Sequence, residues 1–423
     1  MSDPKLTPEL KRLIELDKRL VEVGKKIKIL TSLNWPEKLS IEFLADWKKG
    51  NPRLPKVNYP KVDYKAEETE LRAIMKASDR EHPIGNYIFL TAESYWIAAQ
   101  MLEHRGTPQF TEFSIELYGR PTDTIGPQGL SHLGAAQHFI EVTQGFIAAY
   151  NSSEAEFCLS AEQVAAVIQG RLIPYFTDHK VEVVIDPDLS SKAAAGAHRI
   201  RIRGGASFSA MDIEQLIHHE GFVHMLTALN GRAQPHLGSM ALGAPRTTRT
   251  QEGLATFAEL HTSSIDLSRL RRIALRIPAV AMGLDGGSFI DVFKYFLESG
   301  QDEKESFQST SRVFRGGDPK GKVVFTKDAV YLEGLILTHT FLRKTVQANK
   351  YHFAEYLFSG RLTLGDVVAL EPFFQSGLIA PPRYEPPWLV NRNCLAAYLC
   401  YAAFANTISL GNIALEDFRT RHI

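Results

Sequence analysis

His219-Glu220-Gly221-Phe222-Val223-His224 is the stretch around which the fold of this chain can be argued, because it places two imidazoles on either side of a carboxylate. A second carboxylate follows in Gln251-Glu252-Gly253-Leu254-Ala255, 28 residues past the second imidazole. Two histidines and one glutamate supply three donors to a zinc ion and leave one position open to water. The pattern therefore predicts a catalytic zinc site with the ligands His219, His224 and Glu252.

The spacing of the two histidines constrains the helix that carries them. The usual metallopeptidase pair is four residues apart, a rotation of about 400° that leaves both side chains on one face. His219 and His224 are five residues apart, which on a regular helix would separate them by about 140°. A π-type bulge absorbs the extra residue, and Gly221 lowers the energy needed to distort the backbone there. The sequence therefore predicts a π bulge between the two histidines.

Neighbouring residues leave alternatives open. His218 is six residues from His224 and is expected to be a neighbour of the site and not a ligand. Glu252 is preferred as third ligand because a distal glutamate near the start of a second helix is typical of such zinc enzymes. Histidines near an acid also occur by chance, so spacing alone leaves an ordinary histidine-rich helix possible. The alternative third donors are His236, Glu259 and His261.

Three blocks of sequence, in this order, resemble the tyrosine carboxypeptidase family. They are the His-Glu-x-x-x-His motif, the Gln-Glu-Gly-Leu-Ala motif, and Phe325-Thr326-Lys327-Asp328-Ala329-Val330-Tyr331-Leu332-Glu333-Gly334. That family includes microtubule-associated enzymes that remove the C-terminal tyrosine of α-tubulin, and bacterial proteins named for a QEGLA motif and labelled modulators of flavohaemoglobin expression. The resemblance runs from roughly Glu70 to the C-terminus. The chain lacks the long N-terminal extension of the tubulin enzymes, so the bacterial branch is the closer match and tubulin is an open question as substrate.

The resemblance also implies roles for residues at the site. It implies zinc binding by the two histidines and Glu252, and it makes Glu220 the catalytic acid/base. Glu220 is expected to take a proton from zinc-activated water and pass it to the leaving amine. A developing oxyanion needs a further donor, for which Tyr331 is the candidate and His339 the weaker one. The alternative for Tyr331 is a core-facing tyrosine in a long helix.

Removal of a C-terminal residue also needs a cation for the substrate's terminal carboxylate. Arginine suits this role because its planar guanidinium pairs with a carboxylate through two hydrogen bonds. Arg315 and Lys327 are favoured because they flank the block that resembles the family, although either would also serve as a surface charge. Arg312 is a further neighbour. The predicted substrate-binding residues are Arg315, Lys327, Arg249 and Arg201.

Most of the chain has the apolar spacing of helices. Helices are predicted over residues 7–30, 87–102 and 133–150, and Ser160-Ala161-Glu162-Gln163 is a capping box that opens another. The spacing in residues 110–118 suits either a helix or a strand.

One region is predicted to be a sheet. Residues 181–185 end at Asp186-Pro187, and residues 198–203 alternate between apolar and polar side chains. Ser209, with Asp212 three residues later, is predicted to cap the zinc-binding helix. An exposed strand edge there would pair with extended substrate backbone. The alternative is that the arginines of this strand form a solvated face that protects the edge.

Together these patterns predict a predominantly helical α+β fold. We expect a zincin-like metallopeptidase with a small antiparallel sheet beside the zinc-binding helix. Residues 51–64 are rich in Pro, Lys and Asn and are predicted to be a linker. Residues 1–64 are therefore predicted to form an N-terminal helical arm and linker, and residues 65–423 the catalytic domain.

Composition limits the possible partners. Lys+Arg and Asp+Glu are both 48 of 423 residues, so no net field favours nucleic acid or an acidic membrane, and neither is expected as a partner. The three cysteines, Cys158, Cys394 and Cys400, are an odd and widely spread set that favours a reducing compartment. The last two lie in an apolar run, residues 394–410, which is short for a bilayer crossing and is predicted to be a buried helix with buried thiols. No signal peptide is evident, and a cytoplasmic location is expected.

The sequence therefore predicts a zinc-dependent metallocarboxypeptidase that acts on the C-terminus of a peptide or protein. A tyrosine, another aromatic residue or an acidic residue is the candidate for removal. One alternative is a zinc peptidase of other positional specificity. The other is a non-enzymatic regulatory protein with a structural metal, which would have no need of Glu220.

Overall fold

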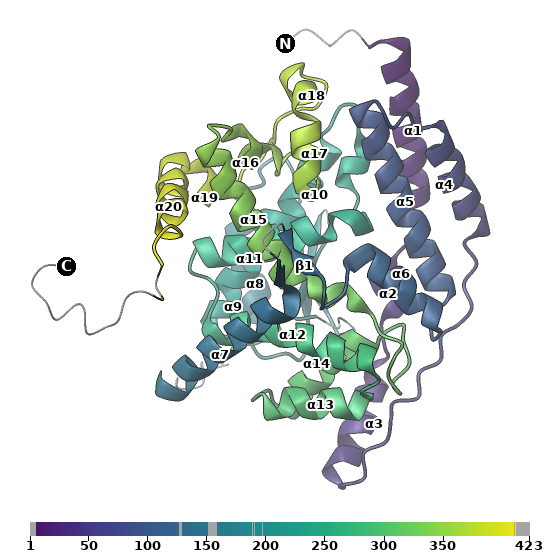
Figure 1. The fold of residues 1–423 in the computed structure, drawn as a ribbon, viewed down its shortest axis with the longest axis vertical. Coiled ribbons are helices and arrows are strands. Elements are labelled where there is room, and N and C mark those ends of the chain that lie inside the picture. The colour runs from purple at the N-terminus through teal and green to yellow at the C-terminus, as the bar shows by residue number, and fades with distance from the viewer. Residues whose placement is uncertain are drawn as a thin grey trace, which may run out of the picture.

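The computed structural model describes residues 6–126, 129–150, 159–187, 189, 191–196, 198–409 and 411, and these are mostly helical with two small sheets. The α-helices are, in chain order, α1 (Pro8–Gly24), α2 (Ile29–Leu33), α3 (Glu37–Lys48), α4 (Lys65–Ala77), α5 (Pro83–Glu103), α6 (Pro108–Tyr118), α7 (His132–Tyr150), α8 (Ala161–Leu172), α9 (Ala210–Leu216), α10 (Leu226–Arg232), α11 (Thr248–His261), α12 (Leu267–Asp285), α13 (Phe289–Glu298), α14 (Glu303–Phe314), α15 (Val330–Gln347), α16 (His352–Tyr356), α17 (Leu364–Ala369), α18 (Glu371–Gln375), α19 (Pro387–Val390) and α20 (Arg392–Ala405). The π-helical segment η2 (Ile217–Met225) joins α9 to α10, and the 3-10 helices are η3 (Gly238–Ala241), η4 (Pro245–Thr247) and η5 (Thr326–Ala329). Figure 1 shows α1, α4 and α5 side by side along one flank, and α20 on the opposite side of the molecule.

The larger sheet lies beside the helix that carries the histidine motif. It has the order β3 (Glu182–Asp186), β5 (Arg199–Arg203), β4 (Ala193–Ala195), with β3 parallel and β4 antiparallel to β5. The prediction of an antiparallel sheet is therefore wrong for one of its two pairings. The predicted strand over residues 198–203 is also central and not an edge, because β4 covers its outer side. A two-stranded antiparallel pair, β1 (Thr124–Ile125) and β2 (Leu130–Ser131), completes the described strands.

Most of the local signals for helices are confirmed. Residues 87–102 lie within α5 and residues 133–150 lie within α7, whereas the helix predicted over residues 7–30 is interrupted between the end of α1 at Gly24 and the start of α2 at Ile29. Ser160 and Gln163 form the predicted capping box at the start of α8. Ser209 and Asp212 form another at the start of α9, where the Ser209 hydroxyl accepts from the Asp212 N–H. The ambiguous residues 110–118 are helical, and residues 51–64 contain no regular secondary structure.

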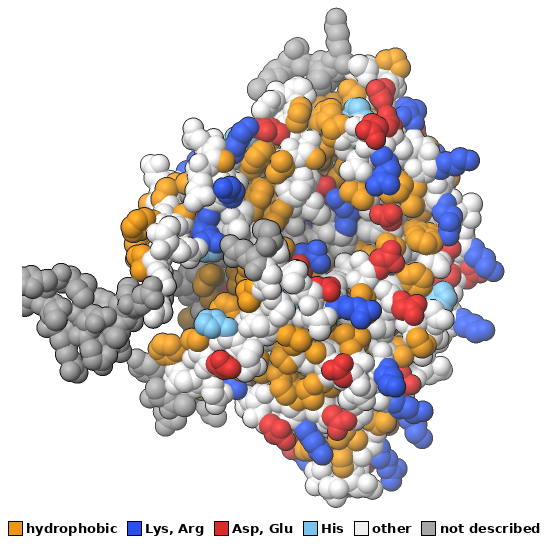
Figure 2. Space-filling view, viewed as in Figure 1, with side chains coloured by type: hydrophobic (Ala, Val, Ile, Leu, Met, Phe, Trp, Pro, Cys, Tyr) orange, Lys and Arg blue, Asp and Glu red, His pale blue; other side chains and the backbone are white. Residues whose placement is uncertain are grey.

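The N-terminal helices share their hydrophobic core with the helices that carry the candidate site. Leu13, Leu16 and Leu20 of α1 are buried in the same apolar cluster as Val223 of η2. The outer side of this flank carries Lys, Arg, Asp and Glu side chains (Figure 2). This division into a buried apolar stripe and a charged outer face explains why the arm packs as a regular amphipathic helix.

The prediction of a buried C-terminal helix is wrong. Cys394 and Cys400 are exposed on α20, and Tyr401 and Phe404 are 71% and 64% exposed. Only part of α20 faces the rest of the molecule, through Leu395 and Leu399. Cys158 lies outside the described residues. Among the helices that the structure describes, none combines the length and the apolar character needed to cross a bilayer.

Candidate metal centre and cleft

The three residues predicted as ligands converge on one point. One ligand atom from each of His219, His224 and Glu252 lies within 4.8 Å of the others. Glu252 Oε2 is 3.5 Å from His219 Nε2 and 3.7 Å from His224 Nε2. The two imidazole centroids are 4.7 Å apart. This arrangement of two imidazole nitrogens and one carboxylate oxygen is the donor set of a catalytic zinc site.

The π-helical segment makes this convergence possible. In a π-helix the backbone bonds link residues five apart, so His219 and His224 lie one above the other despite their spacing. The segment covers both histidines, from Ile217 to Met225. The predicted bulge is confirmed, and it extends over nine residues. A Cβ at Gly221 would lie 2.9 Å from Leu172 of α8, so the small residue also permits close packing.

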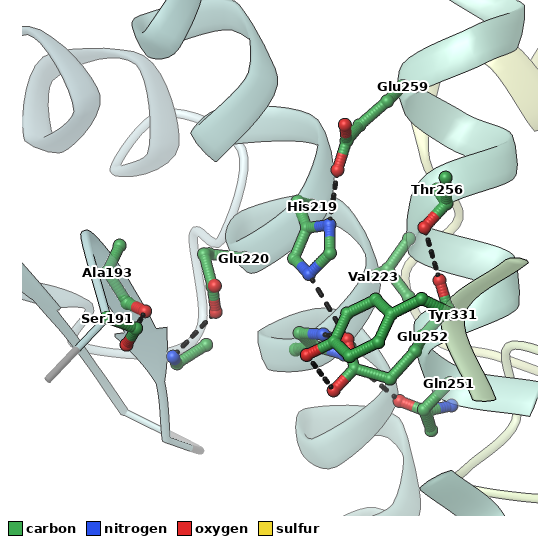
Figure 3. A network of polar contacts seen from close by, with 12 residues as sticks. Ser191, Ala193, His219, Glu220, Val223, Gln251, Glu252, Thr256, Glu259 and Tyr331 are labelled. Carbon is green, nitrogen blue, oxygen red and sulfur yellow. Dashed lines mark hydrogen bonds and ion pairs between the residues drawn. The ribbon is translucent and has the colours of Figure 1, made fainter. Parts of the chain in front are cut away.

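Each imidazole is oriented through its other nitrogen. His219 Nδ1 lies 2.6 Å from Oε1 of the fully buried Glu259 (Figure 3), and Arg269 pairs with the same oxygen at 3.0 Å. His224 Nδ1 is 3.5 Å from Gln251 Oε1, which also accepts from the Thr227 hydroxyl. Both Nε2 atoms are thereby directed to the shared point, as is usual for metal-binding histidines.

Glu259, one of the alternative third donors, therefore has a different role. Burial raises the pKa of Glu259, but the attraction of Arg269 and His219 outweighs it and lowers the pKa to about 2. The carboxylate is ionised and faces the far side of the His219 ring from Glu252. It orients and polarises that imidazole, as a carboxylate behind a metal-bound histidine does.

The electrostatics of the centre favour a cation. Burial lowers the pKa of His219, but hydrogen bonds to Glu252 and Glu259 raise it to about 10. Burial opposes the charge of Glu252, but Lys327 and the two histidines hold its pKa well below the usual range. The same carboxylates that stabilise a positive imidazolium would stabilise a divalent metal held between the rings. The residues present thus fit a metal ion in donor type and in charge.

Glu252 is itself held in place by two donors. Lys327 Nζ lies 2.8 Å from Glu252 Oε1, and the Tyr331 hydroxyl donates to the same oxygen at 3.0 Å (Figure 3). Oε2 is left to face the imidazoles. A close approach of α11 to α15 brings these groups together, because a Cβ at Gly253 would lie only 2.2 Å from the Gly334 backbone. Lys327, predicted to bind substrate, lines the cleft and contacts a candidate metal ligand.

Glu220 is anchored on the edge of the sheet. Its Oε2 accepts from the Ala195 N–H at 2.7 Å, and Figure 3 shows its side chain turned toward that strand. Gly196 N–H donates to Arg199 and Arg203 N–H donates to Lys192 across the sheet. Every second residue of this segment therefore forms its backbone hydrogen bonds with β5. Ala195 lies between two such residues, so its N–H points away from β5. The β4 strand that holds Glu220 was not predicted.

These groups line a cleft with a volume of about 590 Å³. Its walls carry an excess of positive charge, with ten Lys or Arg side chains against five Asp or Glu. Part of this charge is neutralised by carboxylates that do not line the cleft, since Glu259 pairs with Arg269, Asp328 with Arg312 and Arg276, and Asp186 with Arg201. The cationic side chains of the cleft are Lys192, Arg201, Arg203, Arg269, Arg272, Arg276, Lys304, Arg312, Arg315 and Lys327.

Arg315 differs from its neighbours because it is buried and forms no ion pair with any residue that the structure describes. Arg312 forms two 2.6 Å hydrogen bonds with Asp328, and Arg276 lies 3.7 Å from the same carboxylate. Arg315 is 6% exposed, packs its guanidinium 5.3 Å from the Phe325 ring centroid, and has no hydrogen-bond partner for its Nε among the described residues. Burial, reinforced by Arg312, lowers the pKa of Arg315 to about 10. An anion entering the cleft would relieve this desolvation.

The structure places the remaining predicted residues as follows. Arg201 lines the cleft but pairs with Asp186 at 3.1 Å. Arg249 is not among the lining residues, and its Nε pairs with Glu333 at 2.5 Å. His339, the weaker oxyanion candidate, lies 3.2 Å from the Tyr398 hydroxyl, also away from the cleft.

The other histidines considered as ligands do not join the cluster. His218 packs against Phe222, and His261 stacks on Phe257 with 5.8 Å between centroids. His236 is also absent from the metal-binding group found among the described residues.

Two supporting contacts of the site were not predicted from the sequence: Glu259 orients the His219 imidazole, and the Ala195 N–H holds the Glu220 carboxylate. Glu259 is seven residues after Glu252 on α11, two turns along the same face, a spacing that would have placed it near His219.

The geometry of this cluster is that of a metallopeptidase site. His219, His224 and Glu252 converge on one point, and buried Glu259 orients one of the imidazoles. Glu220 lies in the same cleft and is free of the metal ligand cluster. Comparison with known proteins agrees: the model of the MATCAP family, the microtubule-associated tyrosine carboxypeptidases, matches residues 42–407. The chain belongs to this family and is a metallopeptidase of the carboxypeptidase type. No curated protein sequence matches it.

Proposed function

We propose that this protein is a zinc-dependent carboxypeptidase that removes the last residue of a peptide or protein. The observation that carries the proposal is the convergence of His219, His224 and Glu252 on one point in a cleft that also holds Arg315, which is buried and has no ion pair among the described residues. We further propose that its architecture around the metal is zincin-like, from the helical histidine motif beside a strand edge. Kinship with the bacterial branch remains a prediction from the QEGLA motif.

We propose a different role in hydrolysis for each residue of the site. A zinc ion held by the two histidines and Glu252 would supply Lewis acidity and an acidified water. Glu220, placed by the Ala195 N–H, takes the water proton and returns it to the leaving amine. Tyr331 is the donor proposed for the oxyanion, and its hydroxyl would exchange its present bond to Glu252 for one to the substrate.

The strand edge gives the substrate backbone a partner. β4 lines the cleft, and its residues Ala193 and Ala195 direct their backbone groups away from β5. The Ala195 N–H is occupied by Glu220 and the Ala193 carbonyl by the Ser191 hydroxyl at 2.6 Å. We propose that an extended substrate adds to this edge and displaces the Ser191 contact.

Arg315 is the residue proposed to hold the terminal carboxylate. Lys327 already neutralises Glu252, and Arg312 and Arg276 share Asp328. Arg315 has no such carboxylate among the described residues, and its guanidinium can form two parallel hydrogen bonds with a substrate carboxylate. We propose an aromatic last residue, as the description of the family as tyrosine carboxypeptidases suggests, with an acidic residue as the alternative.

A peptide library with diverse C-termini, incubated with the zinc-loaded protein and followed by mass spectrometry, tests the proposed function. Loss of one residue from the C-terminal end is expected. Shortening from the N-terminus or internal cleavage would instead establish a peptidase of other positional specificity. An unchanged library would overturn the proposed activity.

Amidation of the substrate's C-terminus is expected to reduce kcat/KM, because it removes the charge that Arg315 recognises. A hydrogen bond to a charged group contributes about 1.5–3 kcal/mol, so the loss should be about 10- to 100-fold. Arg315→Met should show the same loss with the free acid and little further effect of amidation. The matched control is Arg272→Met, a cleft arginine that pairs with Glu305 at 3.5 Å. Equal sensitivity of both variants to amidation would remove Arg315 from this role.

A further inference from the structure

The junction between η2 and α10 leaves one backbone carbonyl without a backbone partner. In a π-helix each N–H bonds the carbonyl five residues earlier, and the Leu226 N–H still donates to Gly221 in this way. In α10 the offset is four residues. Because the offset shortens by one, the carbonyls at the junction outnumber the N–H groups by one. Val223 and Leu226 are buried there, and a carbonyl without a donor inside a protein is destabilising, so a side chain is needed.

Two side chains supply donors to this junction. The Thr227 hydroxyl lies 2.7 Å from the Val223 carbonyl oxygen and 3.3 Å from that of His224. It also lies 3.0 Å from Gln251 Oε1, so its single proton has three acceptors within reach. Arg361 Nη2 donates to the His224 carbonyl at 3.2 Å. Arg361 is therefore the donor that this carbonyl does not share with the other two acceptors.

The segment that carries Arg361 is fixed on both sides. Asn230 Nδ2 of α10 donates to the Phe358 carbonyl at 2.7 Å. The Arg361 N–H donates to the Met240 carbonyl at 2.7 Å, and a Cβ at Gly360 would lie only 2.7 Å from the Met240 side chain. The guanidinium thus reaches the junction from a backbone that is bound to α10 and to η3.

The guanidinium of Arg361 lies near the metal centre without a carboxylate partner among the described residues. It forms no ion pair in this part of the chain, and its Nε has no hydrogen-bond partner there. Burial lowers the pKa of Arg361, and the charges of Glu220 and Glu252 are close enough to act against this effect. A fixed cation beside a metal site repels a divalent ion. The charge of Arg361 therefore opposes metal binding, and its hydrogen bond to the His224 carbonyl is the contact that can favour it.

We infer that Arg361 is a positioning residue of the metal centre, which stabilises the π-helical offset between His219 and His224 through the His224 carbonyl. This inference rests on the metal centre of the proposed function. Without that offset, a regular helix would turn the two imidazoles about 140° apart. Arg361 acts on the backbone of a candidate ligand, from a segment more than a hundred residues along the chain, and does not itself contact the metal position.

Arg361→Met tests the inference, because it removes the donor and leaves an apolar side chain. The zinc affinity of the full-length protein, measured by competition with a chromophoric chelator, should fall by about 10- to 100-fold, the usual effect of losing a group that supports a metal ligand. Arg361→Lys restores a donor and should regain most of the affinity. Loss of charge alone would change the affinity in the opposite direction, because removing a nearby cation favours a divalent ion.

The matched control is Arg343→Met. Arg343 on α15 also has an Nε without a partner among the described residues, and it does not line the cleft. Should Arg361→Met not fold by circular dichroism, Arg361→Gln takes its place with the same expectation, because its shorter side chain does not reach the carbonyl.

The inference and the proposed function fail in different ways. An unchanged or higher zinc affinity in Arg361→Met would overturn the positioning role, as would an equal loss in Arg361→Lys or in Arg343→Met. Zinc binding by the unsubstituted protein without C-terminal trimming would overturn the proposed function and leave the positioning role standing. Absence of zinc binding by the unsubstituted protein would overturn both.

Discussion

Glu220→Gln is expected to lower kcat by about 100- to 10,000-fold, the usual contribution of a general acid/base. The amide cannot accept the water proton, but its oxygen can still accept from the Ala195 N–H that now holds Glu220 at 2.7 Å. The side chain should therefore keep its position, and the metal ligands beside it should be unaffected. Turnover of a peptide with a free C-terminus, measured together with metal content, separates chemistry from metal loss.

The matched control for this variant is Glu214→Gln. Glu214 lies on α9, one and a half turns before the motif, and its exposed carboxylate pairs with Arg171. It carries the same change of charge without a place in the cleft. Full turnover by metal-loaded Glu220→Gln would rule out the general-base role and reopen the interpretation of the centre as a structural metal site.

The part of the site that could be predicted from the sequence is the part encoded in spacing along one segment. A five-residue step between His219 and His224 has one simple structural solution, and the π-helix adopts it. The capping box at Ser209 is equally local, because a hydroxyl and an N–H three residues apart meet only at a helix start. Such relations depend on backbone geometry and not on the rest of the fold.

The roles that depend on pairing between distant segments were not predictable in the same way. Lys327 is 75 residues from Glu252, and nothing in its own neighbourhood distinguishes a partner of a buried carboxylate from a substrate-binding cation. The β4 strand consists of three alanines, which have no alternating pattern and little strand propensity. It forms because its backbone can pair with the edge of β5, a contact that the sequence of β4 alone does not encode.

The apolar run at residues 394–410 was misjudged for a related reason. Hydrophobic composition does not say how much of a helix surface finds a partner. In α20 only Leu395 and Leu399, four residues apart, are buried, so one stripe packs and the rest stays exposed. The proposed division at residue 64 also remains a prediction, since α1 packs into the same core as the candidate site.

His219→Ala is expected to abolish both metal binding and peptide cleavage. Removing a group that only supports a ligand lowers metal affinity by about 10- to 100-fold, and loss of one of three protein donors should exceed that. Glu259 keeps its ion pair with Arg269 at 3.0 Å, so the surrounding helices should remain folded, which circular dichroism checks.

His218→Ala is the matched control one residue away, since that imidazole packs against Phe222 and takes no part in the cluster. Dialysed samples of both variants, assayed for bound zinc and for turnover, should differ in both measurements. Equal zinc content in the two would mean that the metal, if one is bound, does not depend on the imidazole that faces Glu252.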